Sequence, residues 1–222
     1  MKRVVIGIPT NKFEETTAIK GDSNIEIVKV IRKPKSLPSC LNEIAKEVGK
    51  DDYVIFVHDD VFFKDVLSTI KSILNGFEKY DIIGCVGSYR FAPWLPVWVV
   101  DKRACRGELL QGQGKRVGQT SFSKVKYGNP GSVVVIDGFL MAVKGSVFEK
   151  IKFDERFGFH LYDMDFCLQS FFQGFKIGVV DMGEVFHESL GDYGSMEWVN
   201  EVHKFILKWR DKLDNWVEKL EE

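Results

Sequence analysis

Apolar positions along the first half of the chain alternate between short continuous runs and stretches with helical spacing. The runs at residues 4–8 and 53–57 predict buried strands, and the alternation of apolar and polar residues over 25–31 predicts another strand. Apolar residues at helical spacing over 36–48 and 66–77 predict two amphipathic helices. Strands that alternate with helices indicate parallel βαβ units, so we expect an α/β fold whose sheet is flanked by helices.

The second half of the chain continues this pattern after one interruption. Residues 89–131 are rich in Gly, Trp and basic residues and show little periodicity, which predicts a long loop. A lid or acceptor loop and a plain exposed loop are both open interpretations of this segment. The other expected elements are strands at 81–86, 133–136 with a continuation through 139–143, and 175–180, and helices at 146–151, 163–172 and 195–222.

Composition narrows the class of protein. The 31 Lys and Arg residues nearly balance the 32 Asp and Glu residues, which argues against a nucleic-acid partner bound by bulk charge. The four cysteines are widely separated and form no CxxC pair, which excludes a knuckle-type zinc site and favours free thiols in a reducing cytosol. No apolar stretch reaches the ~18 residues of a transmembrane segment. We expect a cytoplasmic protein, and a peripheral place at the inner membrane face stays open.

The amphipathic helix expected at 195–222 has three candidate partners. Its stretch from 197 to 222 holds seven acids and five bases, whereas a helix at a membrane surface is usually basic on its polar face. Packing against the rest of the domain, or against a second subunit in a homodimer, is the better interpretation.

Ionisable side chains follow several of the predicted strands. His58, Asp59 and Asp60 end the apolar run "YVIFVHDDV", Asp137 ends another strand, and His187 follows a third. A hard cation such as Mg²⁺ or Mn²⁺ prefers carboxylate oxygens, accepts imidazole and leaves positions for phosphate oxygens. Helix N-caps or solvated turns are the alternative for the acids, and an ordinary surface or core position is the alternative for His187.

The order of these motifs resembles a known family. The segment "VIDGFLMAVKGSVFEKIKFDERFGFHLYDMDFCLQSFFQGFKIGVVDMGEVFHES" is similar to the second half of a family 2 glycosyltransferase, and "VVIGIPT" and "YVIFVHDDV" match its first half. A DxD-like motif alone is weak, but these motifs in this order are fairly specific. The resemblance implies a GT-A (nucleotide-diphospho-sugar transferase) fold, with a mostly parallel, Rossmann-like sheet flanked by helices and a long C-terminal helix.

The resemblance implies roles for particular residues in catalysis and metal binding. Asp163 matches the general base that deprotonates the acceptor hydroxyl. Asp60 matches the last acid of the DxD motif, and His187 matches the late histidine. Together these two residues would hold Mn²⁺ or Mg²⁺.

The donor would meet residues at three places in the sequence. Pro9 and Thr10 match the end of the first strand, where the nucleoside lies. His58 and Asp59 occupy the start of the DxD-like motif. Gly138 matches the small residue that lets the donor sugar approach the backbone, and Asp137 adjoins it.

The same resemblance divides the chain into parts. A single domain would span 1–222, with a nucleotide-binding half at 1–88 and an acceptor and catalytic half at 89–194. The second half includes the lid loop at 89–131, and the C-terminal helix follows at 195–222.

The sequence departs from the family pattern at three places. His58 stands where the first acid of DxD is usual, and Tyr162 replaces the glutamate before the general base. Arg32 and Lys33 stand where an acid normally follows the second strand, so the nucleotide base stays undefined.

The leading hypothesis is a metal-dependent, inverting glycosyltransferase of polysaccharide biosynthesis. It would move a sugar from a UDP-, GDP- or dTDP-sugar to a hydroxyl of a glycan or lipid-linked acceptor. A non-catalytic sugar-nucleotide-binding module, or a degenerate relative, is the alternative. A nucleotidyltransferase ranks last, because "IPTNKFEE" has no glycine directly after the first strand.

Overall fold

The computed structural model describes residues 2–10, 17–20, 25–32, 35–92, 97–113, 121–189 and 194–213. Its helices follow the predicted apolar spacing closely. They are α1 Leu37–Ala45, α2 Val66–Gly76, α3 Tyr162–Phe172 and α4 Met196–Leu213. The expected continuation of the last helix to 222 lies outside the described residues. The helix expected at 146–151 is a 3₁₀ turn, η2 Gly145–Glu149.

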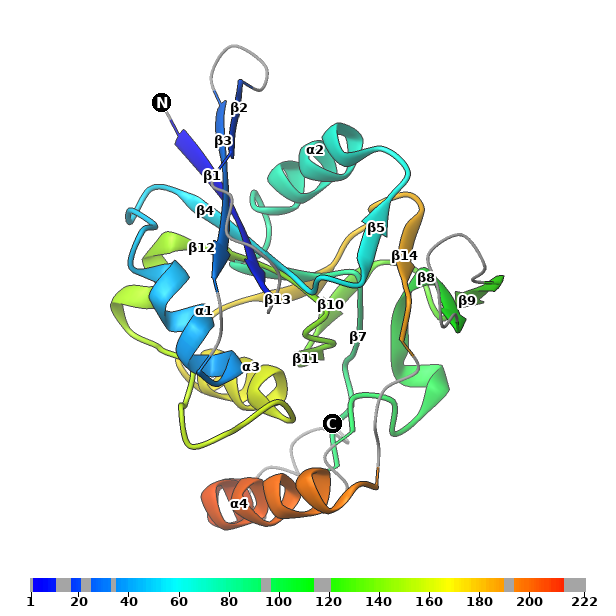
Figure 1. Cartoon of the computed structure of the whole chain (residues 1–222). Coiled ribbons are helices and arrows are strands. Elements are labelled where there is room, and N and C mark those ends of the chain that lie inside the picture. The colour runs from blue at the N-terminus through cyan, green and yellow to red at the C-terminus, as the bar shows by residue number, and fades with distance from the viewer. Residues whose placement is uncertain are drawn as a thin grey trace.

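The main sheet is built around the apolar runs of the sequence (Figure 1). Its order is β10-β13-β6-β12-β4-β1-β3-β2, with β4 and β3 each parallel to β1, and β13 parallel to β6. The remaining neighbours in this sheet are antiparallel. Its strands are β1 Lys2–Pro9, β2 Thr17–Lys20, β3 Ile25–Arg32, β4 Tyr53–Val57, β6 Ile82–Gly84, β10 Gly131–Val133, β12 Leu140–Lys144 and β13 Ile177–Val179. Three of the seven described strand pairs are parallel and four are antiparallel, so the sheet is mixed rather than mostly parallel as expected.

A second sheet crosses the carboxyl end of the first one. Its order is β11-β7-β8-β14-β5, and β9 pairs with β8. Its strands are β5 Val61–Phe63, β7 Val86–Ser88, β8 Cys105–Gln113, β9 Ser121–Lys126, β11 Val135–Ile136 and β14 Val185–His187. Each of the two strands predicted at 81–86 and 133–136 is a pair of short strands in the structure, with one member in each sheet.

The segment expected as a loop at 89–131 has regular structure over part of its length. It contains the 3₁₀ turn η1 Lys102–Ala104 and the β8–β9 hairpin. All six residues of β9 are exposed or half-buried. The strand therefore has no buried apolar face, and its sequence shows no alternating apolar pattern that would predict it.

Strand β4 joins the two halves of the core, because its side chains alternate between the faces of the sheet. On one face Tyr53 stacks on Phe77 at the end of α2, with ring centroids 4.5 Å apart. On the other face Phe56 contacts Phe153, which stacks on Phe166 of α3 at 4.2 Å. With a helix layer on each side, β4 is buried along its length, and the residue that follows it emerges at the carboxyl edge of the sheet.

Helix α4 packs on the domain beneath α3 (Figure 1), which confirms one of the partners expected for the C-terminal helix. Phe205 and Trp209 on its inner side are buried. Trp209 Nε1 donates to Asp165 Oδ1 at 2.8 Å, and Lys208 Nζ lies 2.6 Å from the same oxygen. Asp165 is fully buried in α3, so these two donors compensate a carboxylate that water cannot reach.

Removal of the Lys208 ammonium should destabilise the protein strongly. The change Lys208→Met leaves the buried Asp165 carboxylate without its cation and should lower the free energy of unfolding by about 3–5 kcal/mol at pH 7. Urea unfolding measures the difference. Arg210→Met is the matched control on the same helix, and it should cost at most about 1 kcal/mol because the Arg210–Asp211 pair is exposed. Equal losses for the two variants would contradict this role of Lys208.

Candidate functional site

The turn after β4 brings two potential metal ligands to the edge of the sheet. Just after β4, the His58 amide donates to the carbonyl of Phe139 at 2.9 Å. Strand β5 then begins at Val61. Asp60 lies within this turn, and its Oδ1 atom is buried and has no hydrogen-bond partner. A carboxylate oxygen in that state is costly unless a cation reaches it.

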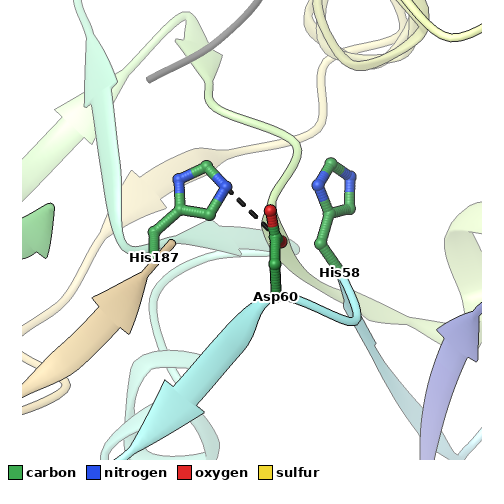
Figure 2. Close-up of side chains that lie close together, drawn as sticks. All are labelled: His58, Asp60 and His187. Atoms are coloured by element: carbon green, nitrogen blue, oxygen red, sulfur yellow. Dashed lines mark ion pairs between the residues drawn. The ribbon is translucent and has the colours of Figure 1, made fainter. Parts of the chain in front are cut away.

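The third potential ligand comes from the short strand β14. His187 pairs in register with Val61 of β5, so it lies next to Asp60 across the ladder. Its Nε2 atom is 3.6 Å from Asp60 Oδ1 (Figure 2), and its ring stacks on Phe139 at 4.4 Å. One ligand atom each from His58, Asp60 and His187 lies within 4.8 Å of the others. Two imidazoles and a carboxylate, one oxygen of which has no hydrogen-bond partner, fit a divalent cation.

Burial sets the protonation of these three groups. It lowers the pKa of His58 to about 4, with a further decrease from His187. It also lowers the pKa of His187, and it raises the pKa of Asp60. Both imidazoles are therefore neutral near pH 7, which is the form that binds metals.

Asp163 lies in the first turn of α3 and faces the same cavity. Its Oδ2 atom accepts from the Gly138 amide and its Oδ1 atom from the Met164 amide, each at 2.8 Å. The preceding Leu161 has φ 61°, and among the described residues it is the only non-glycine with positive φ. Burial raises the pKa of Asp163 above its ordinary range.

Asp60, Asp163 and His187 line one cavity of about 290 Å³. The structure thus brings together the three residues that the sequence singled out for catalysis and metal binding. Asp137 lines the same cavity, and burial, with a contribution from Asp163, raises its pKa to about 7.

A second cavity of about 450 Å³ adjoins the first and shares His58, Asp60 and Phe159 with it. It is lined by the expected donor residues Pro9, Thr10 and Asp59. Thr10 Oγ1 donates to Asp59 Oδ2 at 2.6 Å, which ties the end of β1 to the turn after β4. The carboxyl ends of the parallel strands therefore meet here, as the doubly wound pattern predicts.

Gly138 lines neither cavity, although it adjoins both Asp163 and Tyr162. A Cβ at this position would clash with the Tyr162 hydroxyl and lie 2.8 Å from Asp163 Cβ. Close packing of these two side chains thus already requires glycine here, whether or not a donor sugar also approaches.

The helix-cap alternatives are wrong, whereas Asp59 and Asp60 do lie in a turn, in which Asp59 is exposed. Asp65, rather than Asp59 or Asp60, caps α2 by accepting from Ser68. Asp163 is not the N-cap of α3, because Leu161 occupies that position.

Several cavity residues carried no clear signal in the sequence. Phe159, His160 and Tyr162 precede Asp163 on the wall, and Trp198 reaches it from α4. Their types suit a core as well as a site, so only the fold identifies them. Trp98 also lines the cavity, and it is buried and meets Tyr127 edge-on at 5.4 Å.

A search of the described residues for membrane-spanning helices finds none with the length and apolar character that crossing a bilayer demands.

Two solved structures were compared with this fold. The structure of GalNAc-T7 with UDP, GalNAc and Mn²⁺ matches with a TM-score of 0.53 at 10% identity, over 97% of this chain and 49% of that one. The chain thus spans about half the length of that protein, and the likeness is one of fold. The structure of A197 from STIV matches with a TM-score of 0.43 at 11% identity, over 85% of this chain and 86% of that one.

Sequence comparisons give the family. A search of curated proteins finds no match. The model of a family described as "Glycosyltransferase like family" matches residues 15–209. Since that match covers most of the sequence, and the fold is that of GT-A glycosyltransferases, the chain belongs to this glycosyltransferase-like family.

Proposed function

We propose that the protein is a metal-dependent, inverting glycosyltransferase that moves a sugar from a nucleoside diphosphate to a hydroxyl of a glycan or lipid-linked acceptor. The observation that carries the proposal is the convergence of Asp60, Asp163 and His187 on one cavity. Family membership supports glycosyl transfer as the reaction.

The donor would lie across the two adjoining cavities. Its nucleoside would occupy the cavity beside Pro9, Thr10 and Asp59, and its diphosphate would approach Asp60 and His187. These two residues would hold Mn²⁺ or Mg²⁺, which supplies positive charge to the departing diphosphate. The orphaned Asp60 oxygen supports this assignment, and the GT-A neighbour solved with UDP and Mn²⁺ is consistent with it.

Asp163 would act as the general base. The acceptor oxygen attacks the anomeric carbon, its proton passes to the Asp163 carboxylate, and the bond from the anomeric carbon to the diphosphate oxygen breaks. Attack from the face opposite the leaving group inverts the configuration. The Gly138 and Met164 amides orient the carboxylate, and its raised pKa makes it a stronger base than an exposed aspartate.

The acceptor would bind at the end of the cavity beside α3 and α4. Phe159 is 53% exposed there and Trp198 is half-buried, and aromatic rings offer apolar faces to sugars. His160 lines the same wall and lowers the pKa of Asp163, against the larger effect of burial.

Location and assembly belong to the same proposal. The four cysteines are buried and form no disulfide with one another, which supports a reducing compartment such as the cytoplasm, where sugar nucleotides would be available. The exposed Val199 and Leu207 on α4 suit a contact with a second copy of the chain.

Loss of the base should abolish transfer without abolishing donor binding. Asp163→Asn keeps the size of the side chain but cannot accept the acceptor proton, so the transfer rate should fall by about 10²–10⁴-fold. Affinity for the nucleoside diphosphate, measured by calorimetry with Mn²⁺ present, should change little. The exposed Asp181→Asn serves as control and should retain the normal rate. Full transfer by the Asp163 variant would remove this residue from the role.

The pH dependence of transfer should report the same group. Asp163 must be ionised to accept a proton, and burial raises its pKa above the ordinary value of 3.8. The transfer rate, as kcat/KM, should therefore fall as pH decreases through a value higher than 3.8. Asp137 is the other group that could cause this fall in rate, because its pKa is about 7. If Asp163 is responsible, the fall in kcat/KM at low pH should persist in Asp137→Asn. If the fall in kcat/KM at low pH disappears in that variant, the titrating group is Asp137.

Metal and nucleotide should stabilise the protein together. A bound ligand at a hundred times its Kd adds about 2.7 kcal/mol, so thermal shifts with UDP, GDP and dTDP, each with and without Mn²⁺, should identify the donor base. Asp60→Asn and His187→Ala should lose the Mn²⁺-dependent shift. His203→Ala, on the exposed side of α4, should keep it. A Mn²⁺-dependent shift that survives in both site variants would place the ion elsewhere.

A further inference from the structure

The two departures from the family motif at His58 and Tyr162 are in direct contact. His58 Nε2 lies 2.8 Å from the Tyr162 hydroxyl, although 104 positions separate the residues in the sequence. Both side chains line the cavity with Asp60 and Asp163. Two unusual residues that touch each other suggest one shared function instead of two separate losses.

The hydrogen bonds of Tyr162 determine which nitrogen of His58 carries the proton. A tyrosine hydroxyl has one proton, and that of Tyr162 donates it to the Gly138 carbonyl at 3.1 Å. With that proton shared with the carbonyl, the imidazole is the donor in the 2.8 Å bond, which assigns the His58 proton to Nε2. A neutral imidazole has a single N–H, and its Nδ1 atom is left with a free lone pair.

Tyr162 has little freedom to change this arrangement. Its side chain is 4% exposed, and its hydroxyl fills the space in which a Cβ of residue 138 would lie. The position of the hydroxyl is therefore set by packing against the backbone at Gly138, and the position of the His58 ring follows from it.

The free nitrogen of His58 faces the proposed metal site. Figure 2 shows the ring nitrogen nearest the His58 backbone, Nδ1, on the side of the Asp60 carboxylate. Asp60 Oδ1 has no hydrogen-bond partner, so no protein donor competes for that space. His187 approaches the same oxygen from the other side.

We propose that Tyr162 is a positioning residue that holds His58 in the Nε2-protonated tautomer, so that His58 Nδ1 becomes a third metal ligand beside Asp60 and His187. The inference deepens the proposed function and depends on its metal site. Groups that orient a metal-binding histidine typically change metal affinity by about 10–100-fold.

A site with two imidazoles and one carboxylate has consequences for the choice of ion. Mg²⁺ prefers oxygen ligands, whereas imidazole suits first-row transition ions. The protein should therefore bind Mn²⁺ or Co²⁺ more tightly than Mg²⁺.

The tautomer can be tested without any metal. The chain has four histidines, so ¹⁵N-detected imidazole spectra at pH 7.5 are simple, and His58→Ala assigns the His58 signals. The metal-free protein should show His58 protonated on Nε2, and Tyr162→Phe should shift it toward a mixture of tautomers. A His58 protonated on Nδ1 in the unaltered protein would overturn the inference.

Metal affinity supplies the second test. By calorimetry, Tyr162→Phe should weaken Mn²⁺ binding about 10–100-fold in the unaltered background and have no effect when His58→Ala is already present. Tyr127→Phe removes a hydroxyl from the same cavity wall and should leave the Mn²⁺ affinity unchanged. Urea unfolding checks that each variant is folded.

The outcomes separate this inference from the proposed function. Tight Mn²⁺ binding that Tyr162→Phe does not alter would overturn the role of Tyr162 and leave the metal-dependent enzyme intact. A protein that binds no Mn²⁺ at all would overturn both.

Discussion

One carboxylate oxygen, buried without a hydrogen bond just after an apolar strand, is the constraint on which the site depends. Asp60 Oδ1 is shielded from water and receives no hydrogen bond, an arrangement that costs free energy unless a positive charge compensates it. The fold places two histidines around this Asp60 oxygen. Strand β4 delivers Asp60 and His58, and the β5–β14 ladder brings His187 within 3.6 Å. We interpret the free-energy cost of this unpartnered Asp60 oxygen as the cost of maintaining a metal site.

The fold uses different devices for its structural and its functional acids. Asp165 is fully buried but is fully compensated by Trp209 and Lys208, so it attaches α4 and has no capacity left for chemistry. Asp163, two residues earlier, accepts only backbone amides and faces the cavity. Two acids in one helical turn thus differ in environment, because only Asp165 has a cation for a partner.

The sequence predicted much of this, and the failures have physical causes. Continuous apolar runs identified β1 and β4 and helical spacing identified the four helices, because deep burial leaves a strong pattern, and alternation identified β3. Strands β5 and β14 have only three residues each, which is too short for any periodicity, so the ladder that positions His187 was missed. Asp60 was noticed because charges inside apolar runs are rare, whereas Asp163 was singled out by the resemblance to the family motif. Tyr162 was noted only as a departure, since its contact with His58 spans 104 positions.

The central claim is that one cation and one diphosphate occupy the cavity formed by Asp60, Asp163 and His187. A crystal structure with Mn²⁺ and the stabilising nucleoside diphosphate, with anomalous data collected for manganese, tests it most directly. The account predicts a single strong anomalous peak between Asp60 and His187, with the diphosphate beside it and the Asp163 carboxylate across the cavity. A diphosphate bound elsewhere, or manganese that avoids Asp60, would contradict it.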